Sequence, residues 1–280
     1  MNISELKDIC SQVRRDIVRM VHAVNSGHPG GSLGCTEFFV ALYFKIMKHK
    51  KEFNMDGKNE DLFFLSNGHI SPVFYSVLAR SGYFPVKELN TFRLINSRLQ
   101  GHPATKEGLP GVRIASGSLG QALSVAIGAA ITKKINKDGS LIYCLCGDGE
   151  LQEGQIWEAI MYAGAKEIDN LILTVDVNKQ QICGSTDEIL NLGNLNQKIS
   201  AFNWRVIEIN NGNNMQNVIE GIEKAKSKTK EKKPICILMH TEMGYGVDFM
   251  MGSHKWHGIA PNDVQLKNAL SQLKKTMEDY

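Results

Sequence analysis

The stretch Gly147-Asp148-Gly149-Glu150-Leu151-Gln152-Glu153-Gly154 decides the fold, because it joins an apolar run at 141–146 to a helix-like run from Gln155. This pattern predicts a strand that leaves an α/β sheet at its carboxyl edge, a tight glycine turn and the start of a helix. Backbone N–H groups and the positive helix end would then face a phosphate. Asp148 adds a hard oxygen ligand, so the pattern indicates a diphosphate held by a metal.

A second part of this site follows the next apolar run, 171–177, which ends at Asn178. A right-handed crossover between parallel strands would return Asn178 to the sheet edge that carries Asp148. Magnesium prefers an octahedral set of oxygens and usually keeps substrate phosphates among its ligands. We therefore expect Asp148, Asn178 and Gln180 to bind the metal, through a carboxylate, an amide oxygen and a backbone carbonyl. An ordinary Asp-Gly turn is the alternative interpretation.

Apolar runs and helical patterns alternate along the rest of the chain. This alternation predicts an α/β fold with a doubly wound, mostly parallel sheet and helices on both faces. The chain shows no linker, so we expect 1–280 to form a single domain. Strands are predicted at 61–66, 141–146, 171–177, 204–209 and 235–240, helices at 4–23, 35–47, 72–81, 121–134 and 263–277, and loops at 26–34, 179–195 and 241–261.

Further motifs stand along the chain in an order that resembles the transketolase family. The resemblance runs from about residue 8 to about residue 261 and implies the thiamine diphosphate-binding fold. It implies thiamine diphosphate and Mg²⁺, or Ca²⁺ or Mn²⁺ in its place, as cofactors. Besides 147–154, it is carried by Gly27-His28-Pro29-Gly30, Ser66-Asn67-Gly68-His69, Gly101-His102-Pro103, Gly117-Ser118-Leu119-Gly120-Gln121, Asp176-x-Asn178-Lys179 and Gly252-Ser253-His254-x-x-His257-Gly258.

Five histidines fall in glycine-rich loops, where a parallel sheet would collect them at one crevice. They are His28, His69, His102, His254 and His257. The resemblance places the residues that match His28 and His254 near the reacting carbonyl and hydroxyl. It places the matches of His69 and His254 near the diphosphate, and that of His102 near the donor's terminal hydroxyl. We thus expect His28, His102 and His254 to be catalytic. Solvent-facing turns, or a zinc site at His254-x-x-His257, are the alternative interpretations.

The resemblance also assigns the remaining contacts of the cofactor. The loop Gly117-Ser118-Leu119 resembles the one whose backbone accepts the aminopyrimidine amino group. Glu153 matches a glutamate that pairs across a subunit boundary, with helix capping as its alternative role. The expected cofactor-binding residues are His69, Gly117, Ser118, Leu119, Gly147, Asp148, Gly149, Glu153, Asn178 and His254.

The function implied by the resemblance is that of the N-terminal, diphosphate-binding subunit of a split transketolase. Such an enzyme transfers a two-carbon ketol unit from a ketose phosphate to an aldose phosphate. The residues that activate the aminopyrimidine lie in other domains of the family, and only about forty residues follow the run 235–240, too few for another domain of usual size. We therefore expect a separately encoded C-terminal subunit in an α₂β₂ assembly, contacted through helix 121–130 and the acidic Glu150/Glu153 loop.

Four other functions fit parts of the pattern. The chain could serve a split transketolase for a modified sugar, such as apulose phosphate or a sulfosugar. It could also be a 1-deoxyxylulose-5-phosphate synthase-like protein or a nicotinamide-binding Rossmann domain, although no G-x-G-x-x-G follows a first strand. The last alternative is a module that binds a cofactor or partner without turnover. The presence of His28, His69, His102 and His254 argues against it.

Composition argues against several other classes of partner. The formal charge is +3, and no aromatic residue interleaves the Lys-rich stretch 224–233, which predicts a solvated face rather than a nucleic-acid site. The six cysteines form no CxxC, and the N-terminus lacks the apolar core of a secretory signal. No run approaches the roughly twenty apolar residues of a membrane span. We expect a cytoplasmic protein with free thiols and with sugar phosphates as its small ligands.

Overall fold

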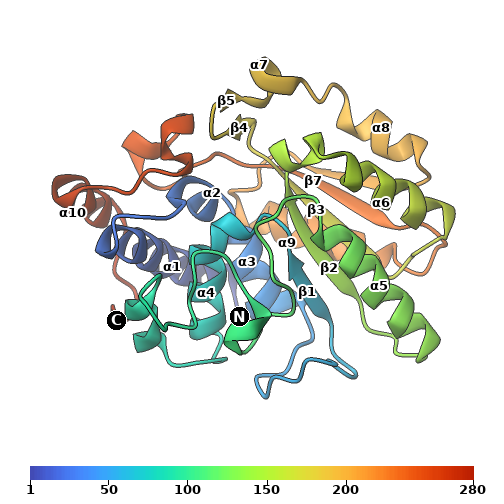
Figure 1. Ribbon diagram of the computed structural model, residues 1–280, viewed down its shortest axis with the longest axis horizontal. Coiled ribbons are helices and arrows are strands. Elements are labelled where there is room, and N and C mark those ends of the chain that lie inside the picture. Colours follow the sequence, from blue (N-terminus) through green and yellow to red (C-terminus); the bar gives the residue numbers. More distant parts are fainter.

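Five parallel strands form the central sheet of the structure, a computed structural model that describes residues 1–280. In spatial order they are β1 (Leu62–Leu65), β2 (Ile142–Gly147), β3 (Leu171–Val177), β7 (Ile235–His240) and β6 (Arg205–Ile209). Every pair of neighbours runs parallel. Figure 1 shows helices on both faces of this sheet, as the alternating sequence pattern predicts.

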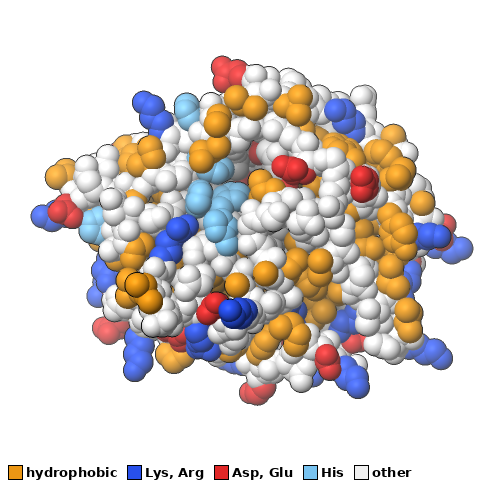
Figure 2. All heavy atoms as spheres, viewed as in Figure 1, with side chains coloured by type: hydrophobic (Ala, Val, Ile, Leu, Met, Phe, Trp, Pro, Cys, Tyr) orange, Lys and Arg blue, Asp and Glu red, His pale blue; other side chains and the backbone are white.

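Two segments predicted as loops, 179–195 and 241–261, begin where β3 and β7 end. The first holds the hairpin of β4 (Gln180–Gln181) and β5 (Gly184–Ser185) and helix α7 (Thr186–Leu190). The second holds the turns η6 (Asp248–Met250) and η7 (His254–His257). Beside this region, Figure 2 shows histidine side chains gathered around a hollow. Shorter turns elsewhere are η2 (Gly68–Ile70), η3 (Val86–Thr91), η4 (Thr105–Glu107) and η5 (Gly149–Gln152).

Alternating side chains of the strands bury two separate hydrophobic layers. Phe63 and Leu65 of β1 pack into a cluster of 51 buried residues, whereas Leu62 and Phe64 pack into one of 25 on the opposite face. The same two-residue period sorts the other strands. The first layer is covered by α1 (Ile3–Ala23), α3 (Thr36–Ala41), α4 (Ser71–Arg80) and α9 (Met215–Ser227), the second by α5 (Ala122–Ile135), α6 (Gly154–Ala165) and α8 (Leu195–Ala201).

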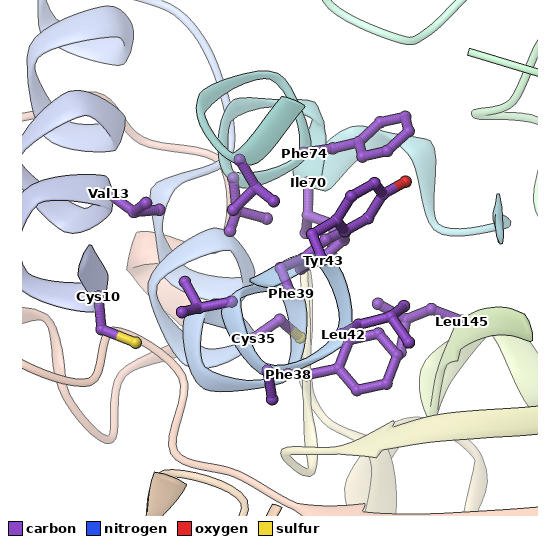
Figure 3. Packing of buried hydrophobic residues seen from close by; sticks show 14 of the residues in the cluster. Cys10, Val13, Cys35, Phe38, Phe39, Leu42, Tyr43, Ile70, Phe74 and Leu145 are labelled. Carbon is purple, nitrogen blue, oxygen red and sulfur yellow. The ribbon is translucent and has the colours of Figure 1, made fainter. Parts of the chain in front are cut away.

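Aromatic rings dominate the first layer. Figure 3 shows part of this cluster, in which Phe38 contacts its neighbour Phe39 on α3, and Phe39 and Tyr43 each contact Phe74 of α4. The rings of Phe39 and Phe63 meet edge to face with centroids 5.4 Å apart, a contact worth about 1 kcal/mol beyond the area that it buries. This packing fixes α4 against β1, and so fixes the turn between them at the carboxyl edge of the sheet.

The largest difference from the predicted elements lies at 26–34, because most of this expected loop is helix α2 (Pro29–Gly34). Pro29 opens the helix at a position where its missing N–H would be unpaired anyway. The Ser32 hydroxyl donates to the carbonyl of His28 at 2.7 Å. The glycines here allow close packing, since a Cβ on Gly30 would meet the carbonyl oxygen of Trp256 at 2.8 Å. The glycine-rich composition therefore reflects tight contact with 241–261.

Two other helices differ from their expected bounds. The helix predicted at 35–47 begins as α3 and then widens into a π-helical turn, η1 (Leu42–Ile46). The helix predicted at 263–277 ends early, as α10 (Asp263–Gln272). The residues after it follow α1, where the Thr276 hydroxyl donates to the carbonyl of Asp8 at 2.6 Å. None of the helices is both long and apolar enough to span a bilayer.

Candidate functional site

The carboxyl ends of β2 and β3 bring Asp148 and Asn178 together. The N–H of Asp148 donates to the carbonyl of Asp176 at 3.0 Å, which extends the ladder between the two strands. Asp148 Oδ2 accepts the N–H of Lys179 at 2.5 Å. The N–H of Gln180 donates to Asn178 Oδ1 at 2.9 Å. The three residues expected to bind a metal therefore lie in one hydrogen-bonded region.

Asp148 and Asp176 form a buried carboxylate pair, with 2% and 1% of their surfaces exposed. Burial raises the pKa of both, and burial with the nearby Asp176 charge raises the pKa of Asp148 to about 7. Hydrogen bonds, rather than basic side chains, are the main effects that oppose this rise in pKa. Asp176 instead accepts hydrogen bonds from Thr241 Oγ1 and, at 2.7 Å, from Asn178 Nδ2. Two such carboxylates beside the oxygens of Asn178 and Gln180 fit a hard divalent cation.

Four histidine rings meet next to this pair. The ring centroid of His28 lies 5.1 Å from that of His69, 6.2 Å from that of His102 and 5.6 Å from that of His257. The rings of His69 and His257 stack at 5.0 Å. His28 precedes α2, His69 lies in the turn after β1, His102 lies in the loop before η4, and His257 ends η7. Four segments far apart in the sequence thus supply one cluster.

His254, expected to be catalytic, is not part of this ring cluster, whereas His257, three residues later, contacts both His28 and His69. His254 begins η7 and acts electrostatically on Glu188, an exposed carboxylate of α7. Gly258, which follows His257, lies so close to His28 that an added Cβ would contact the His28 ring at 3.5 Å. Two histidines three residues apart look equivalent in a single sequence. The structure distinguishes them, because the ring of His257 contacts that of His28.

The clustered histidines are neutral near pH 7. Burial and the surrounding histidines and Arg93 lower the pKa of His28 to about 4. Burial likewise lowers the pKa of His69 and His257, and burial with the charge of Arg93 lowers the pKa of His102. A neutral imidazole can accept a proton from a hydroxyl, so the cluster has the protonation state that a general base needs.

A cavity of about 300 Å³ joins the carboxylate pair to the histidines. Two residues that line it, Asn67 and His28, carry buried polar atoms without a protein partner, Oδ1 and Nδ1 respectively. Such orphaned atoms fit a polar ligand in the cavity. Asn67 belongs to the motif Ser66-Asn67-Gly68-His69, but nothing in the sequence marked it as a site residue. The lining includes His28, Asn67, His69, Gly117, Leu119, Gly147, Asp148, Gly149, Glu153, Asp176, Asn178, Gln180 and His257.

The loop expected to contact the aminopyrimidine closes one wall of this cavity. Gly117 and Leu119 line it, whereas Ser118 does not. Gly117 has φ 121°, and a Cβ there would meet His102 Cδ2 at 2.6 Å, so only glycine fits. Glu153 stands exposed at the N-cap of α6, but its side chain caps no N–H. A capping hydrogen bond therefore does not account for Glu153.

Glu150, expected to contact a partner chain, is instead an internal acceptor with 2% of its surface exposed. One carboxylate oxygen accepts the N–H of Gly120 at 2.7 Å and the Ser66 hydroxyl, and the other accepts the N–H of Gly147 at 3.1 Å. We call this arrangement the Glu150 clasp. It ties together the ends of β1 and β2 and the loop before α5. Of the acidic residues in the stretch 147–154, Asp148 and Glu150 are therefore buried, whereas Glu153 is exposed.

We expect His28 to make the folded chain less stable as the pH falls from about 6.5 to about 4. Its pKa is about 4 in the fold and about 6.5 in an unfolded chain, so in this window the unfolded chain binds more protons. The raised pKa of Asp148 acts in the opposite direction over a similar range. Urea unfolding of the wild type and of His28→Gln at pH 7 and pH 5 isolates the contribution of His28 to the change in unfolding free energy. The variant should lose less stability on acidification, and equal losses would contradict the assignment.

Comparison with known proteins identifies the family of this chain. Residues 6–277 match the family described as transketolase, thiamine diphosphate binding domain. The chain is 34% identical over 278 residues to one of the named subunits of the apulose-4-phosphate transketolase of Phocaeicola vulgatus, covering 99% of this chain and 97% of that protein. It is 36% identical over 271 residues to the 6-deoxy-6-sulfo-D-fructose transketolase subunit SqwG of Clostridium sp. strain MSTE9, covering 97% of each.

A solved structure confirms the predicted fold. The transketolase of Campylobacter jejuni superimposes with a TM-score of 0.90 at 35% identity, covering 98% of this chain and 43% of that one. The chain thus spans less than half of that transketolase but nearly all of the two subunits. The resemblance drawn from the sequence motifs is also confirmed. Matched along almost its whole length, the chain belongs to the transketolase family, as a thiamine diphosphate binding domain.

Proposed function

We propose that this chain is the N-terminal, diphosphate-binding subunit of a split transketolase. With a separately encoded C-terminal subunit it would transfer a two-carbon ketol unit from a ketose phosphate to an aldose phosphate, using thiamine diphosphate and Mg²⁺. One observation carries the proposal: a single cavity joins the carboxylate pair of Asp148 and Asp176 to neutral histidines. Relatives of the same length that are named as subunits support the division into two chains.

The residues of the cavity divide between binding and proton transfer. Asp148, Asn178 and the carbonyl of Gln180 would hold the metal, and the backbone at Gly147 and Gly149 would face the diphosphate beside His69. Bound there, thiamine diphosphate would supply the electron sink for breaking and forming a carbon–carbon bond.

Three of the histidines are assigned to the substrate. His28, His102 and His257 would take protons from the sugar's hydroxyl groups and return them, since each has a lowered pKa and is neutral near pH 7. His28 lies between the other two, with ring centroids 6.2 Å and 5.6 Å away. His254, half-buried beside Glu188, stays outside this set.

The sugar could be modified rather than an intermediate of the pentose phosphate pathway. Two relatives that cover nearly the whole chain are named for apulose-4-phosphate and for 6-deoxy-6-sulfo-D-fructose. The transketolase of Homo sapiens is 33% identical over 257 residues, a similar level. Identity alone therefore does not separate these sugars, and the donor and acceptor are questions for assay.

Exposed apolar side chains on two neighbouring helices support the need for a partner. Helices α5 and α6 pack side by side, and Val125, Met161 and Tyr162 are 45%, 54% and 46% exposed on them. Gly128 adds open space, because a Cβ there would contact nothing within 4 Å. Exposed apolar patches are typical of association surfaces. A two-fold arrangement of such surfaces would give the α₂β₂ assembly.

Mixing the purified chain with its C-terminal partner is expected to create ketol transfer, whereas the chain alone should be inert. The cavity offers groups for the diphosphate and metal, but the family activates the aminopyrimidine from another domain. Coupled assays with pentose phosphates, apulose-4-phosphate and sulfofructose, together with light scattering for a heteromer, provide the measurement. Complete two-carbon transfer by the isolated chain would refute the split-enzyme proposal. Turnover restricted to one modified sugar would identify the substrate.

A further inference from the structure

Arg14 of α1 has a buried side chain that donates hydrogen bonds to two segments far away in the sequence. Its Nε donates to the carbonyl of Tyr245 at 2.9 Å, and its Nη2 donates to the carbonyl of Leu33 at 3.3 Å. Nη2 also pairs with Glu37 Oε2 of α3 at 2.6 Å. The side chains of Arg14 and Glu37 are only 6% and 7% exposed, so water competes little for these bonds. The planar guanidinium thus serves three acceptors at once.

The two carbonyls belong to segments that supply His28 and His257 to the histidine cluster. Leu33 lies in α2, which begins directly after His28. Tyr245 lies in the long segment after β7, which also holds His257. Figure 1 shows α2 beside the orange-red turns of that segment. Because the rings of His28 and His257 meet across this boundary, with centroids 5.6 Å apart, the bonds of Arg14 span the same boundary as the histidine contact.

Glycines allow the segment after β7 to come close enough for these bonds. Gly246 has φ 94°, and an added Cβ there would meet Arg14 Cδ at 2.9 Å. The N–H of Gly244 donates to the carbonyl of Gly30 in α2 at 2.9 Å. The boundary between α2 and this segment therefore consists of close backbone packing together with the bonds of Arg14.

Glu37 keeps Arg14 charged in this buried place. Burial lowers the pKa of Arg14, but the charge and the hydrogen bond of Glu37 raise it above its ordinary value. A buried ion pair of this kind is often no more stabilising than apolar side chains of similar volume. The net stability of the fold is therefore a weak reason for the pair, and the three directed bonds of the guanidinium are a stronger one.

We propose that Arg14 is a positioning residue, which sets the contact between the rings of His28 and His257 by holding α2 against the segment after β7. Arg14 does not line the cavity, so it acts only through these two histidines. The consequence for turnover rests on the proposed ketol transfer, whereas the geometric role does not. Proton transfer depends on placement, and a displacement of about 1 Å can cost about 100-fold in rate.

The first experiment measures the geometry without catalysis. Nuclear Overhauser signals among the imidazole protons of His28, His69 and His257 are recorded in the full chain with ¹³C-labelled histidine. All three pairs should give a signal in the wild type, since their ring centroids lie 5.1, 5.6 and 5.0 Å apart. The double variant Arg14→Met/Glu37→Gln leaves no unpaired charge in the core. We expect it to lose both signals to His257 and to keep the signal between His28 and His69.

The double variant Arg113→Met/Glu60→Gln is the matched control. Arg113 is also buried, pairs with Glu60 at 2.9 Å, and donates to the carbonyls of Asn54 and Met55. These partners lie in the loop before β1 and not in a segment that carries a clustered histidine. The control removes a similar set of bonds, and all three histidine signals should remain.

Arg14→Lys tests the same role if the double variant does not fold. It keeps a positive charge beside Glu37, but a single ammonium group cannot reproduce the fork that serves both carbonyls. The same two signals should therefore be lost. Signals to His257 that persist in a folded Arg14 variant would overturn the proposal. Their equal loss in the Arg113 control would also overturn it, because general loosening of the core would then account for the change.

The second experiment measures the consequence in the assembled enzyme. Arg14→Met/Glu37→Gln should lower kcat by roughly 10- to 100-fold. The Kd for thiamine diphosphate with Mg²⁺ should change less than about threefold, because Asp148 and Asn178 follow β2 and β3, with which Arg14 forms no hydrogen bond. Wild-type kcat, or an equal weakening of cofactor binding, would overturn the proposal. Absence of transfer in the wild type would refute the proposed function alone, and the histidine signals would still decide the role of Arg14.

Discussion

Replacing Asp148 with Ala is expected to abolish binding of thiamine diphosphate with Mg²⁺ while the fold stays intact. Asp148 is the only carboxylate among the proposed ligands, and it also orders the turn by accepting the N–H groups of Gly149 and Lys179. Changes to groups that merely support a metal ligand often lower affinity by roughly 10- to 100-fold. Loss of the ligand itself should therefore exceed about 100-fold. Calorimetry on the assembled enzyme measures this directly.

Asp56→Ala provides the control for Asp148→Ala. Asp56 is an exposed carboxylate in the loop before β1, at the opposite end of that strand from His69. Its removal subtracts the same formal charge and should leave cofactor affinity unchanged. Circular dichroism should be the same for both variants. If Asp148→Ala bound thiamine diphosphate and Mg²⁺ with wild-type affinity, the assignment of Asp148 to the metal and diphosphate site would be contradicted.

Replacing His28, His102 or His257 with Ala is expected to lower kcat by about 10²- to 10⁴-fold, the usual contribution of a positioned general acid or base. Cofactor affinity should stay within a few-fold for His28→Ala and His102→Ala, because neither residue is among the proposed metal ligands. Steady-state kinetics of the assembled enzyme with its true donor and acceptor is the measurement.

His254→Ala is the informative comparison for His257→Ala. The ring of His257 stacks on that of His69, whereas His254 lies beside Glu188 outside the cluster. We therefore expect the loss of kcat to be much larger for His257→Ala. The reverse order would restore the role that sequence motifs assign to His254. Wild-type kcat/KM in both His28→Ala and His102→Ala would contradict their catalytic role and favour the interpretation that both are ordinary turn residues.

The strands and the edge of the sheet were predictable because their signals are local. The predicted runs 171–177 and 235–240 match β3 and β7 residue for residue, since an apolar run bounded by glycine or polar residues suits a strand buried on both faces. Because β2 and β3 are parallel neighbours, the right-handed crossover between them places Asp148 and Asn178 at one edge of the sheet. The meeting of these two side chains therefore followed from spacing alone.

The parts that sequence analysis missed depend on packing between distant segments. The glycines around Pro29 are typical of a loop. In the structure this segment is helix α2, and its missing side chains let the helix pack closely against Trp256. His257 and His254 differ only in which one meets His28. Asn67 gave no signal of its own, because its buried Oδ1 is noteworthy only once the fold leaves that atom without a partner in the cavity. Each case needed coordinates of residues far away in the sequence.

The Glu150 clasp gives the cavity a property that matters before any ligand arrives. Its oxygens bind donors from three segments that are far apart in the sequence, at Ser66, Gly120 and Gly147. These bonds form during folding, so the conformational entropy of the three loops is lost once, in reaching the native state. A ligand that enters later meets a preorganised floor and spends little of its binding energy on ordering it. The same coupling makes the floor one cooperative unit, in which loosening any one loop loosens all three.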